Sequence, residues 1–163
     1  MTQQSFTRQV LGCERTLYRV ARAMLRRPVD QQDAVQEAVA KAWAKRDTLR
    51  EERYFATWLT RILINECTQI ARRQRRVELM RDWQEDALTA CAGFAEPSAV
   101  DAALDALPDR LRLPTVLHYL EGFSLAEIAG MLHVPLGTVK ARLHTARGAL
   151  RLELSNDEEA DRL

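Results

Sequence analysis

Cationic side chains recur at helical spacing near the C-terminal end of this 163-residue sequence. Intervals of three or four residues separate Lys140, His144, Arg147 and Arg151, and this stripe is flanked by Thr138 and Arg142. Side chains at such intervals share one face of a helix. Lysine and arginine pair with phosphates and hydrogen-bond to base edges, and the first residues of such a helix reach the bases in a major groove. The stripe therefore predicts a DNA-binding surface, with a helical hairpin that has a charged solvent face as the alternative.

The residues before this stripe have the pattern of a helix, a tight turn and a second helix. Ser124 and Glu127 form a capping box, which begins a short helix. The predicted inward positions of that helix are Leu125, Ile128, Ala129 and Leu132. A turn follows at 133–135, and a second helix is predicted to begin near Thr138. The predicted buried positions of the second helix are Val139, Leu143, Ala146 and Leu150. Together these elements predict a helix-turn-helix.

Helical periodicity extends along most of the chain, whereas strand patterns and hairpin turns are almost absent. The first half predicts helices over about 11–25, 30–43 and 54–76. Asp30 is the predicted N-cap of the second of these helices. The third has a predicted core stripe of Phe55, Trp58, Leu59, Ile62, Leu63 and Ile70. The expected fold class is therefore all-α.

The periodicity fades after Met80 and returns near Ala99, across a segment punctuated by Gly, Pro and Ser. We therefore expect two small helical domains joined by a flexible linker. The expected boundaries are 1–80 for the first domain, 81–99 for the linker, 100–155 for the second domain and 156–163 for an acidic tail. Within the second domain, Pro108 fits a helix start, and Pro114 is expected to kink or end the turn that follows.

The formal net charge of +1 conceals an uneven distribution of charge. Residues 1–80 contain 16 Lys and Arg against 9 Asp and Glu, whereas residues 81–100 contain 1 against 4. A basic first half predicts a surface that binds a polyanion, with an ordinary solvated helical surface as the alternative. The aliphatic runs are far shorter than the ~20 residues that span a bilayer, and the first residues lack the apolar stretch of a secretory signal. We therefore expect a cytoplasmic protein without direct membrane insertion.

The residues that could perform catalysis or bind a metal are scattered along the sequence. The three histidines lie on a core-flanking helix, a turn and the DNA-facing helix, without an acid at triad or ligand spacing: His118, His133 and His144. The three cysteines form neither a CxxC motif nor an even-numbered framework: Cys13, Cys67 and Cys91. We expect them to be reduced apolar side chains, with a redox sensor as the alternative. The sequence predicts no enzyme activity, no metal site and no cofactor.

Two sets of motifs resemble the extracytoplasmic-function (ECF) sigma factors of RNA polymerase. In the second half, three segments are similar to region 4 of that family: ALPDR at 106–110, EGFSLAEIA at 121–129 and VPLGTVKARLHTAR at 134–147. In the first half, DQQDAVQEAVAKAW at 30–43 is similar to regions 2.1–2.2, and FATWLTRILIN at 55–65, with the arginine run after it, is similar to regions 2.3–2.4. The resemblance implies a subunit that binds core RNA polymerase and directs promoter-specific transcription initiation by −35 recognition and −10 melting.

The resemblance also implies three sets of binding residues. Those for the −35 element are Thr138, Lys140, Ala141, Arg142, His144, Thr145 and Arg147. Those for the −10 element, with the loop 45–53, are Arg53, Arg61, Asn65, Arg72, Arg73, Arg75 and Arg76. Those for core polymerase are Asp33, Gln36 and Glu37. Because Ala141 and Thr145 stand where many family members carry Ser and Arg, the −35 preference of a relative does not transfer to this chain.

The implied partners are the β′ clamp helices and the β flap of core polymerase, promoter DNA and a sequestering anti-sigma factor, with a monomer expected when the protein is free. On the residues alone, Asp33 and Glu37 could instead complement a helix dipole. Trp43 and Trp58 are interpreted as core residues rather than as base-stacking platforms. The alternative function is a helix-turn-helix regulator that acts without core polymerase, but such proteins usually dimerise, and the basic first half is a poor ligand pocket.

Overall fold

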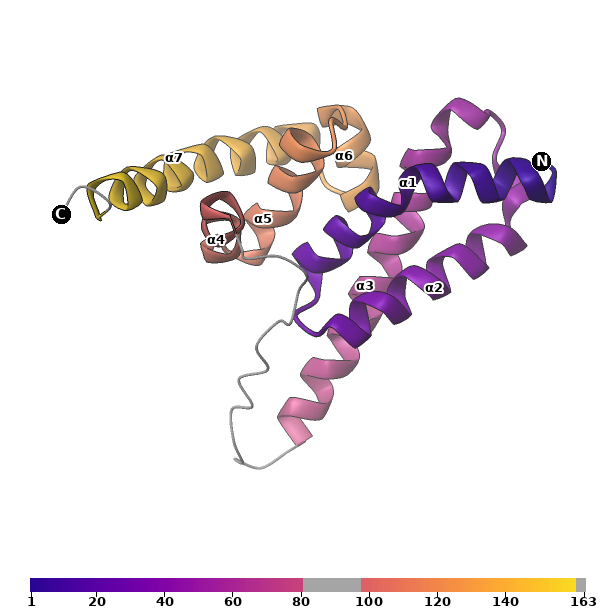
Figure 1. Ribbon diagram of the computed structural model, residues 1–163, viewed down its shortest axis with the longest axis horizontal. Coiled ribbons are helices and arrows are strands. Elements are labelled where there is room, and N and C mark those ends of the chain that lie inside the picture. The colour runs from indigo at the N-terminus through magenta and orange to yellow at the C-terminus, as the bar shows by residue number, and fades with distance from the viewer. Residues whose placement is uncertain (81–97, 161–163) are drawn as a thin grey trace. The chain divides into compact units, whose positions relative to one another are not determined.

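The computed structural model describes residues 1–80 and 98–160. Within these residues the secondary structure consists of seven α-helices with short 3₁₀ and π turns, and no strand is present (Figure 1). The chain forms two compact units, which fall within residues 1–92 and 93–163. The expected all-α fold with two small helical domains is confirmed. Most of the predicted linker lies outside the described residues, and its last residue, Ala99, already belongs to the first helix of the second unit.

The first unit packs α1 (Gln3–Met24), α2 (Pro28–Ala44) and α3 (Phe55–Met80) against one another. Thr2 caps α1 because its hydroxyl accepts a hydrogen bond from the backbone N–H of Ser5 at 3.2 Å. The buried face of α2 carries small side chains at successive turns, Ala34, Ala38 and Ala42, each fully buried, with Val35 buried beside them. Small residues at this spacing allow a close approach of neighbouring helices. The opposite face of α2 is therefore the one presented to solvent.

The prediction that Asp30 caps α2 is wrong. The helix begins at Pro28, and Arg27 is the N-cap residue. Proline fits the first helical position because its φ is already helical and the missing N–H has no partner there. Asp30 instead lies in the first turn, where its carboxylate accepts a hydrogen bond from the side-chain amide of Gln74 on α3 and lies 3.5 Å from Nε of Arg27. Asp30 therefore links α2 to the distal part of α3.

The third helix is longer than predicted, because it continues from Arg76 to Met80. Its core stripe is also shifted from the prediction: Phe55, Leu59 and Leu63 are buried, whereas Trp58, Ile62 and Ile70 are half-buried. The buried positions that the pattern missed include Ile64, Glu66 and Cys67. Packing against both α1 and α2 explains this wider buried face, since a helix between two neighbours covers more than one stripe.

The second unit consists of α4 (Ala99–Ala106), α5 (Asp109–Thr115), the π turn η3 (Val116–Leu120), α6 (Leu125–Leu132) and α7 (Leu136–Ala160). Pro114 lies inside α5 and has no N–H to donate. The chain does not break there but widens into the π turn, in which the N–H of Glu121 donates to the carbonyl of Val116 at 3.1 Å. Gly122, at φ +73°, then reverses the chain. Helix α7 extends through 156–160, the first residues of the predicted acidic tail.

Among the described residues, no helix combines the length and apolarity needed to cross a bilayer.

Candidate nucleic-acid interface

The helix-turn-helix of the second unit is formed by α6 and α7. Both hydrogen bonds of the predicted capping box are present: the backbone N–H of Glu127 donates to Oγ of Ser124 at 3.2 Å, and the backbone N–H of Ser124 donates to Oε2 of Glu127 at 2.8 Å. His133 ends α6 in the left-handed conformation, with φ 54° and ψ 44°. The next helix begins at Leu136, two residues earlier than predicted, because the carbonyl of Pro135 accepts from the N–H of Thr138 at 3.0 Å.

The inward face of α6 differs from the predicted one. Ile128 is buried as expected, but Leu125, Ala129 and Leu132 are half-buried, and Met131 is the second buried residue. Met131 follows Ile128 by three residues and therefore shares its face. The helix-turn-helix core is thus completed by a side chain that the sequence pattern did not select.

Helix α7 separates a buried face from an exposed one. Val139, Leu143 and Ala146 are buried as predicted, whereas Leu150 is half-buried. Of the residues expected at the −35 element, five are exposed and two are half-buried: exposed are Lys140, Ala141, His144, Thr145 and Arg147, and half-buried are Thr138 and Arg142. The hydroxyl of Thr145 donates to the carbonyl of Ala141 at 3.1 Å, so its own proton is already used within the helix.

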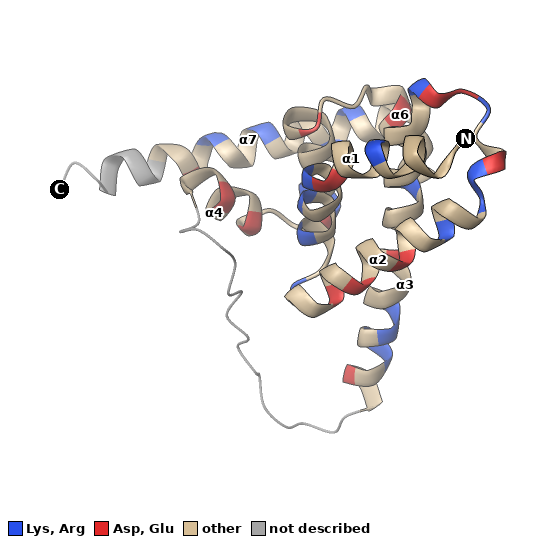
Figure 2. Ribbon diagram, turned by 45° about the vertical axis from the view of Figure 1, so that its right-hand side comes forward, with Lys and Arg blue, Asp and Glu red and all other residues tan. Residues whose placement is uncertain are grey.

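The arginine-rich part of α3 forms a second cationic surface, and Figure 2 shows Lys and Arg along the C-terminal half of this helix. Arg61, Asn65, Arg72 and Arg76 are exposed and follow one another at helical spacing, so they form a single stripe. Arg75 is exposed beside that stripe. Arg73 is also exposed, but it points about 100° away from Arg72, toward α2. The run of arginines therefore divides between two faces of α3.

A shallow open groove lies between α2 and α3. The three residues expected to bind polymerase, Asp33, Gln36 and Glu37, line this groove together with Arg73. They are exposed because they lie on the face of α2 opposite its buried alanines. Figure 2 shows the acidic residues of α2 beside the basic residues of α3. Helical periodicity alone separates Arg73 from the face of Arg72, but only the position of α2 places it in this groove.

An ion pair closes the inner end of the groove. Nζ of Lys41 lies 2.8 Å from both carboxylate oxygens of Glu66, and the Glu66 side chain is only 7% exposed. Glu37 also approaches Nζ of Lys41, at 3.5 Å. The hydrogen bond to Glu66 is the main cause that raises the pKa of the Lys41 ammonium above its usual value. This pair joins α2 to α3 at the position next to Asn65.

Between α2 and α3 the chain forms a loop, residues 45–54, that consists of two 3₁₀ turns, η1 (Arg46–Thr48) and η2 (Glu52–Tyr54). Arg53 is exposed, and its guanidinium pairs with Glu51 at 2.7 Å and lies 4.7 Å from the ring centre of Tyr54. Trp43 and Trp58 are both half-buried, and the ring of Trp58 packs 5.9 Å from that of Phe55.

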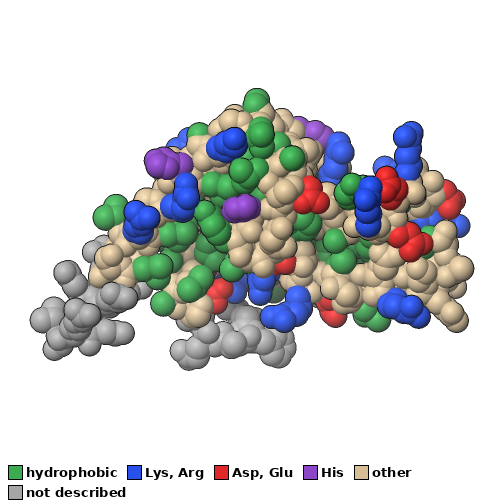
Figure 3. Space-filling model, turned by 90° about the horizontal axis from the view of Figure 1, so that it is seen from above, with side chains coloured by type: hydrophobic (Ala, Val, Ile, Leu, Met, Phe, Trp, Pro, Cys, Tyr) green, Lys and Arg blue, Asp and Glu red, His purple; other side chains and the backbone are tan. Residues whose placement is uncertain are grey.

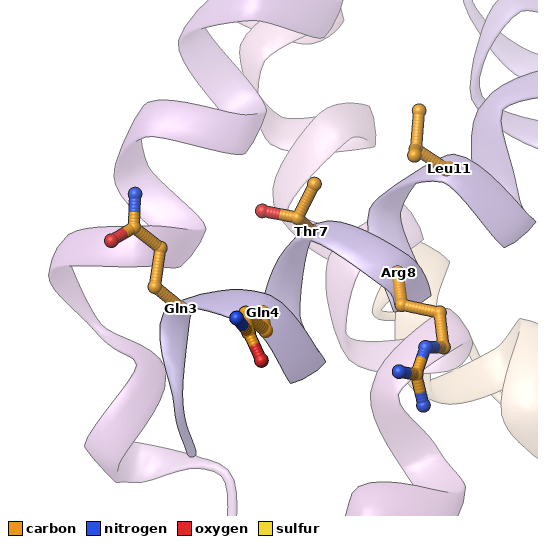
Figure 4. Close-up of a pocket in the computed structure, with 5 residues that line it drawn as sticks. All are labelled: Gln3, Gln4, Thr7, Arg8 and Leu11. Carbon is orange, nitrogen blue, oxygen red and sulfur yellow. The ribbon is translucent and has the colours of Figure 1, made fainter.

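The described residues contain no group of three or more His, Cys, Asp or Glu side chains that could hold a metal ion. Nδ1 of His118 lies 2.9 Å from the carbonyl oxygen of Phe123, so this imidazole bridges η3 to the start of the helix-turn-helix. Cys13 is half-buried and Cys67 is buried, and Cys91 lies outside the described residues. A shallow depression on the first turns of α1 is lined by one helix, as the side chains in Figure 4 show: Gln3, Gln4, Thr7, Arg8 and Leu11.

Comparison with known families assigns both units. Residues 10–77 match the Sigma-70 region 2 family, and residues 98–150 match the Sigma-70, region 4 family. The chain is 31% identical over 159 residues to the ECF RNA polymerase sigma factor SigW of Bacillus subtilis, covering 85% of this chain and 82% of that protein. The chain belongs to the ECF sigma factors. The family resemblance inferred from the motifs is therefore confirmed.

Further relatives of this ECF sigma factor have similar lengths. It is 28% identical to the RNA polymerase sigma factor SigV of Bacillus subtilis, with 86% of each chain covered. Among solved structures it is similar to the sigma factor RpoE of Bartonella quintana in complex with the anti-sigma factor NepR, with TM-score 0.75, 28% identity and coverage of 93% of this chain and 98% of that chain. It is also similar to CnrH in complex with the cytosolic domain of CnrY, with TM-score 0.69, 28% identity and coverage of 96% and 91%.

This ECF sigma factor is a transcription initiation factor. It binds core RNA polymerase and directs promoter-specific initiation through −35 recognition and −10 melting. The alternative of a helix-turn-helix regulator that acts without polymerase is not supported, because a regulator of that kind has no need of the Sigma-70 region 2 that occupies the first unit.

Proposed function

We propose that α7 recognises the −35 element through its exposed face. The observation that carries this proposal is the helix-turn-helix: a capped α6, a left-handed turn at His133 and cations on α7 outside its buried stripe. Because Arg142 is half-buried, its guanidinium is more restricted than an exposed one and suits a fixed bidentate contact to a base. The exposed Lys140 and Arg147 suit phosphates. The remaining contacts come from Thr138, Ala141, His144 and Thr145.

The −10 element is assigned to α3 and to the loop 45–54. The exposed stripe of Arg61, Asn65, Arg72 and Arg76, with Arg75 beside it, is long enough to follow a phosphate backbone. Removing a base from its stack costs a few kcal/mol, so phosphate contacts alone do not open a duplex. A place for the displaced base is needed, and the loop 45–54, with Arg53 near its end, supplies it at the start of the same helix.

Core polymerase is proposed to bind in the groove between α2 and α3. Asp33, Gln36 and Glu37 present exposed acidic and amide groups there, which suits the β′ clamp helices. Arg73 lines the same groove, so its contact is assigned to polymerase rather than to DNA. The second unit is assigned to the β flap.

The free protein is proposed to be a cytoplasmic monomer without a catalytic centre, metal or cofactor. Its activity is proposed to be held in check by an anti-sigma factor. The support for this partner is the similarity to the Bartonella quintana sigma factor, which was crystallised with one.

The test separates promoter recognition from promoter opening. Arg142→Ala and Asn65→Ala are each assembled with core polymerase on one promoter, and occupancy by footprinting is compared with permanganate reactivity of −10 thymines. Arg142→Ala should weaken the binding free energy for the promoter by roughly 1–3 kcal/mol, the value of a bidentate base contact, and so lower occupancy. Polymerase that is bound should still open the DNA. Asn65→Ala should bind at a near-normal level but lose the reactive thymines. Identical profiles for the two variants would refute this division between the units.

A further inference from the structure

One aromatic side chain bridges the two ends of the loop 45–54. Trp43 lies two residues before this loop, and Phe55 follows it directly. The ring of Phe6 lies between them, 5.1 Å from the ring centre of Trp43 and 5.5 Å from that of Phe55, both in edge-to-face geometry. Phe6 is only 5% exposed, and it comes from the first turns of α1, far away in sequence. The two ends of the loop are therefore held by a residue outside the loop.

Polar contacts hold the loop to the same support. The guanidinium of Arg46 lies over the ring of Trp43 at 4.2 Å, and its Nη1 donates to the carbonyl of Trp43 at 2.9 Å. Nε2 of Gln9, one turn along α1 from Phe6, donates to Oε2 of Glu52 at 3.4 Å. Each half of the loop therefore has one contact to the aromatic group or to α1 itself.

We propose that Phe6 is a positioning residue for promoter opening: it clasps Trp43 to Phe55 and so holds the loop 45–54 in the conformation that receives the displaced −10 base. This inference rests on the proposed function of the loop. Edge-to-face rings restrain distance and orientation together. A loop with fixed ends has fewer conformations to lose when it binds single-stranded DNA. Phe6 itself is buried and touches no DNA, so its effect passes through the loop.

The experiment uses the full-length protein with Phe6→Leu and Phe6→Ala. Leucine retains apolar volume but removes the edge-to-face geometry, whereas alanine removes both. The matched control is Val20→Ala, which truncates a fully buried side chain of the same helix, away from the loop. The solvent side of the first turns of α1, drawn in Figure 4, is unchanged in all three variants. Each variant is assembled with core polymerase below its unfolding temperature, and polymerase binding, promoter occupancy and permanganate reactivity are measured.

We expect Phe6→Ala to lower open-complex formation about tenfold, since two aromatic contacts are lost, and Phe6→Leu to lower it less. Polymerase binding should be unchanged. A second readout is amide hydrogen exchange in the free protein: Thr48 and Tyr54 donate backbone hydrogen bonds within the two turns, at 2.9 and 3.1 Å, and should exchange faster in the Phe6 variants alone. Equal loss of opening in Val20→Ala would overturn the proposal, because general destabilisation would then explain the effect.

A further variant distinguishes failure of this inference from failure of the proposed loop function. Arg53→Ala changes an exposed residue at the end of the loop and leaves Phe6 in place. If Arg53→Ala reduces opening and Phe6→Ala does not, the clasp is wrong and the loop assignment stands. If neither variant changes opening, both are wrong. If both variants reduce opening and only the Phe6 variants accelerate exchange in the loop, the clasp is supported.

Discussion

His133 occupies the turn of the helix-turn-helix in a backbone conformation that favours glycine. Its φ of 54° and ψ of 44° are those of a left-handed residue, and apart from glycine it is alone in having a positive φ among the described residues. In this conformation the Cβ atom of an L-residue approaches the following carbonyl oxygen. The side chain of His133 is exposed, so its removal leaves no buried cavity. His133→Gly should therefore stabilise the second unit without changing the orientation of α7.

The magnitude follows from two opposing effects. The left-handed conformation costs an L-residue roughly 1–2 kcal/mol. Glycine does not have this cost, but it increases the entropy of the unfolded chain, which offsets roughly 0.4–1 kcal/mol of the gain. The expected net stabilisation is about 0.5–1 kcal/mol, or about 2–8 °C in Tm for a unit of this size. His133→Ala retains the Cβ atom and should be no more stable than the original protein.

The assay compares unfolding of the Gly and Ala variants in urea by two signals. Far-UV circular dichroism reports both units, since both are helical. Tryptophan fluorescence follows the first unit through Trp43 on α2 and Trp58 on α3; the third tryptophan lies outside the described residues, and the described part of the second unit contains none. The circular dichroism transition should shift in His133→Gly, and the fluorescence transition should not. Promoter affinity should be equal in the Gly and Ala variants. Equal stability of the two variants, or a shift in fluorescence, would refute the strain argument.

Two further predictions concern the first unit. Replacing Asp33 and Glu37 with Lys should abolish co-purification with core polymerase while circular dichroism stays unchanged, because both carboxylates are exposed in the groove between α2 and α3 that is proposed to dock polymerase. Co-purification at the original level would contradict that proposal. Burial is the main cause that raises the pKa of the Cys67 thiol from 9.0 to about 12, and the nearby Glu66 carboxylate is the second. Between these values the unfolded chain loses the thiol proton and the folded one keeps it, so stability should fall by about 1.4 kcal/mol per pH unit from pH 9 upward. Cys67→Ala should lack this part of the alkaline slope, and an unchanged slope would show that the thiol titrates normally.

Local patterns were enough to predict the helix-turn-helix. The capping box of Ser124 and Glu127 satisfies helix-end groups within four residues, and Gly122 permits the chain reversal before it, so both signals are readable without the rest of the fold. The exposed faces of α7 and α2 were predictable for the same reason. Helical periodicity places the cations of α7 outside the buried stripe of Val139, Leu143 and Ala146, and the acids of α2 outside the stripe of buried alanines. Family resemblance then connected these faces to transcription initiation.

The sequence-based predictions were wrong where two neighbouring residues could each satisfy the same local requirement. Both Pro28 and Asp30 are good residues for a helix start, and the chain uses Pro28 because Asp30 has a partner on α3. Met131 and Leu132 are adjacent apolar residues of α6, and only packing against the neighbouring helices decides that Met131 is the buried one. Arg72 and Arg73 are likewise adjacent cations, and only the position of α2 decides that Arg73 lines the groove between α2 and α3 while Arg72 belongs to the exposed stripe of α3.

The sequence by itself determined the helical class, the two-unit order and the residue types on each exposed face, because these depend on intervals of a few residues. Tertiary structure alone decided which distant residues meet. Lys41 pairs with Glu66, 25 positions away, and Phe6 lies between Trp43 and Phe55. Periodicity assigns a side chain to a face of its own helix, but the residue that it meets across the interface depends on the relative position and rotation of two helices. The ion pair beside Asn65 and the aromatic clasp at the loop 45–54 are products of that packing.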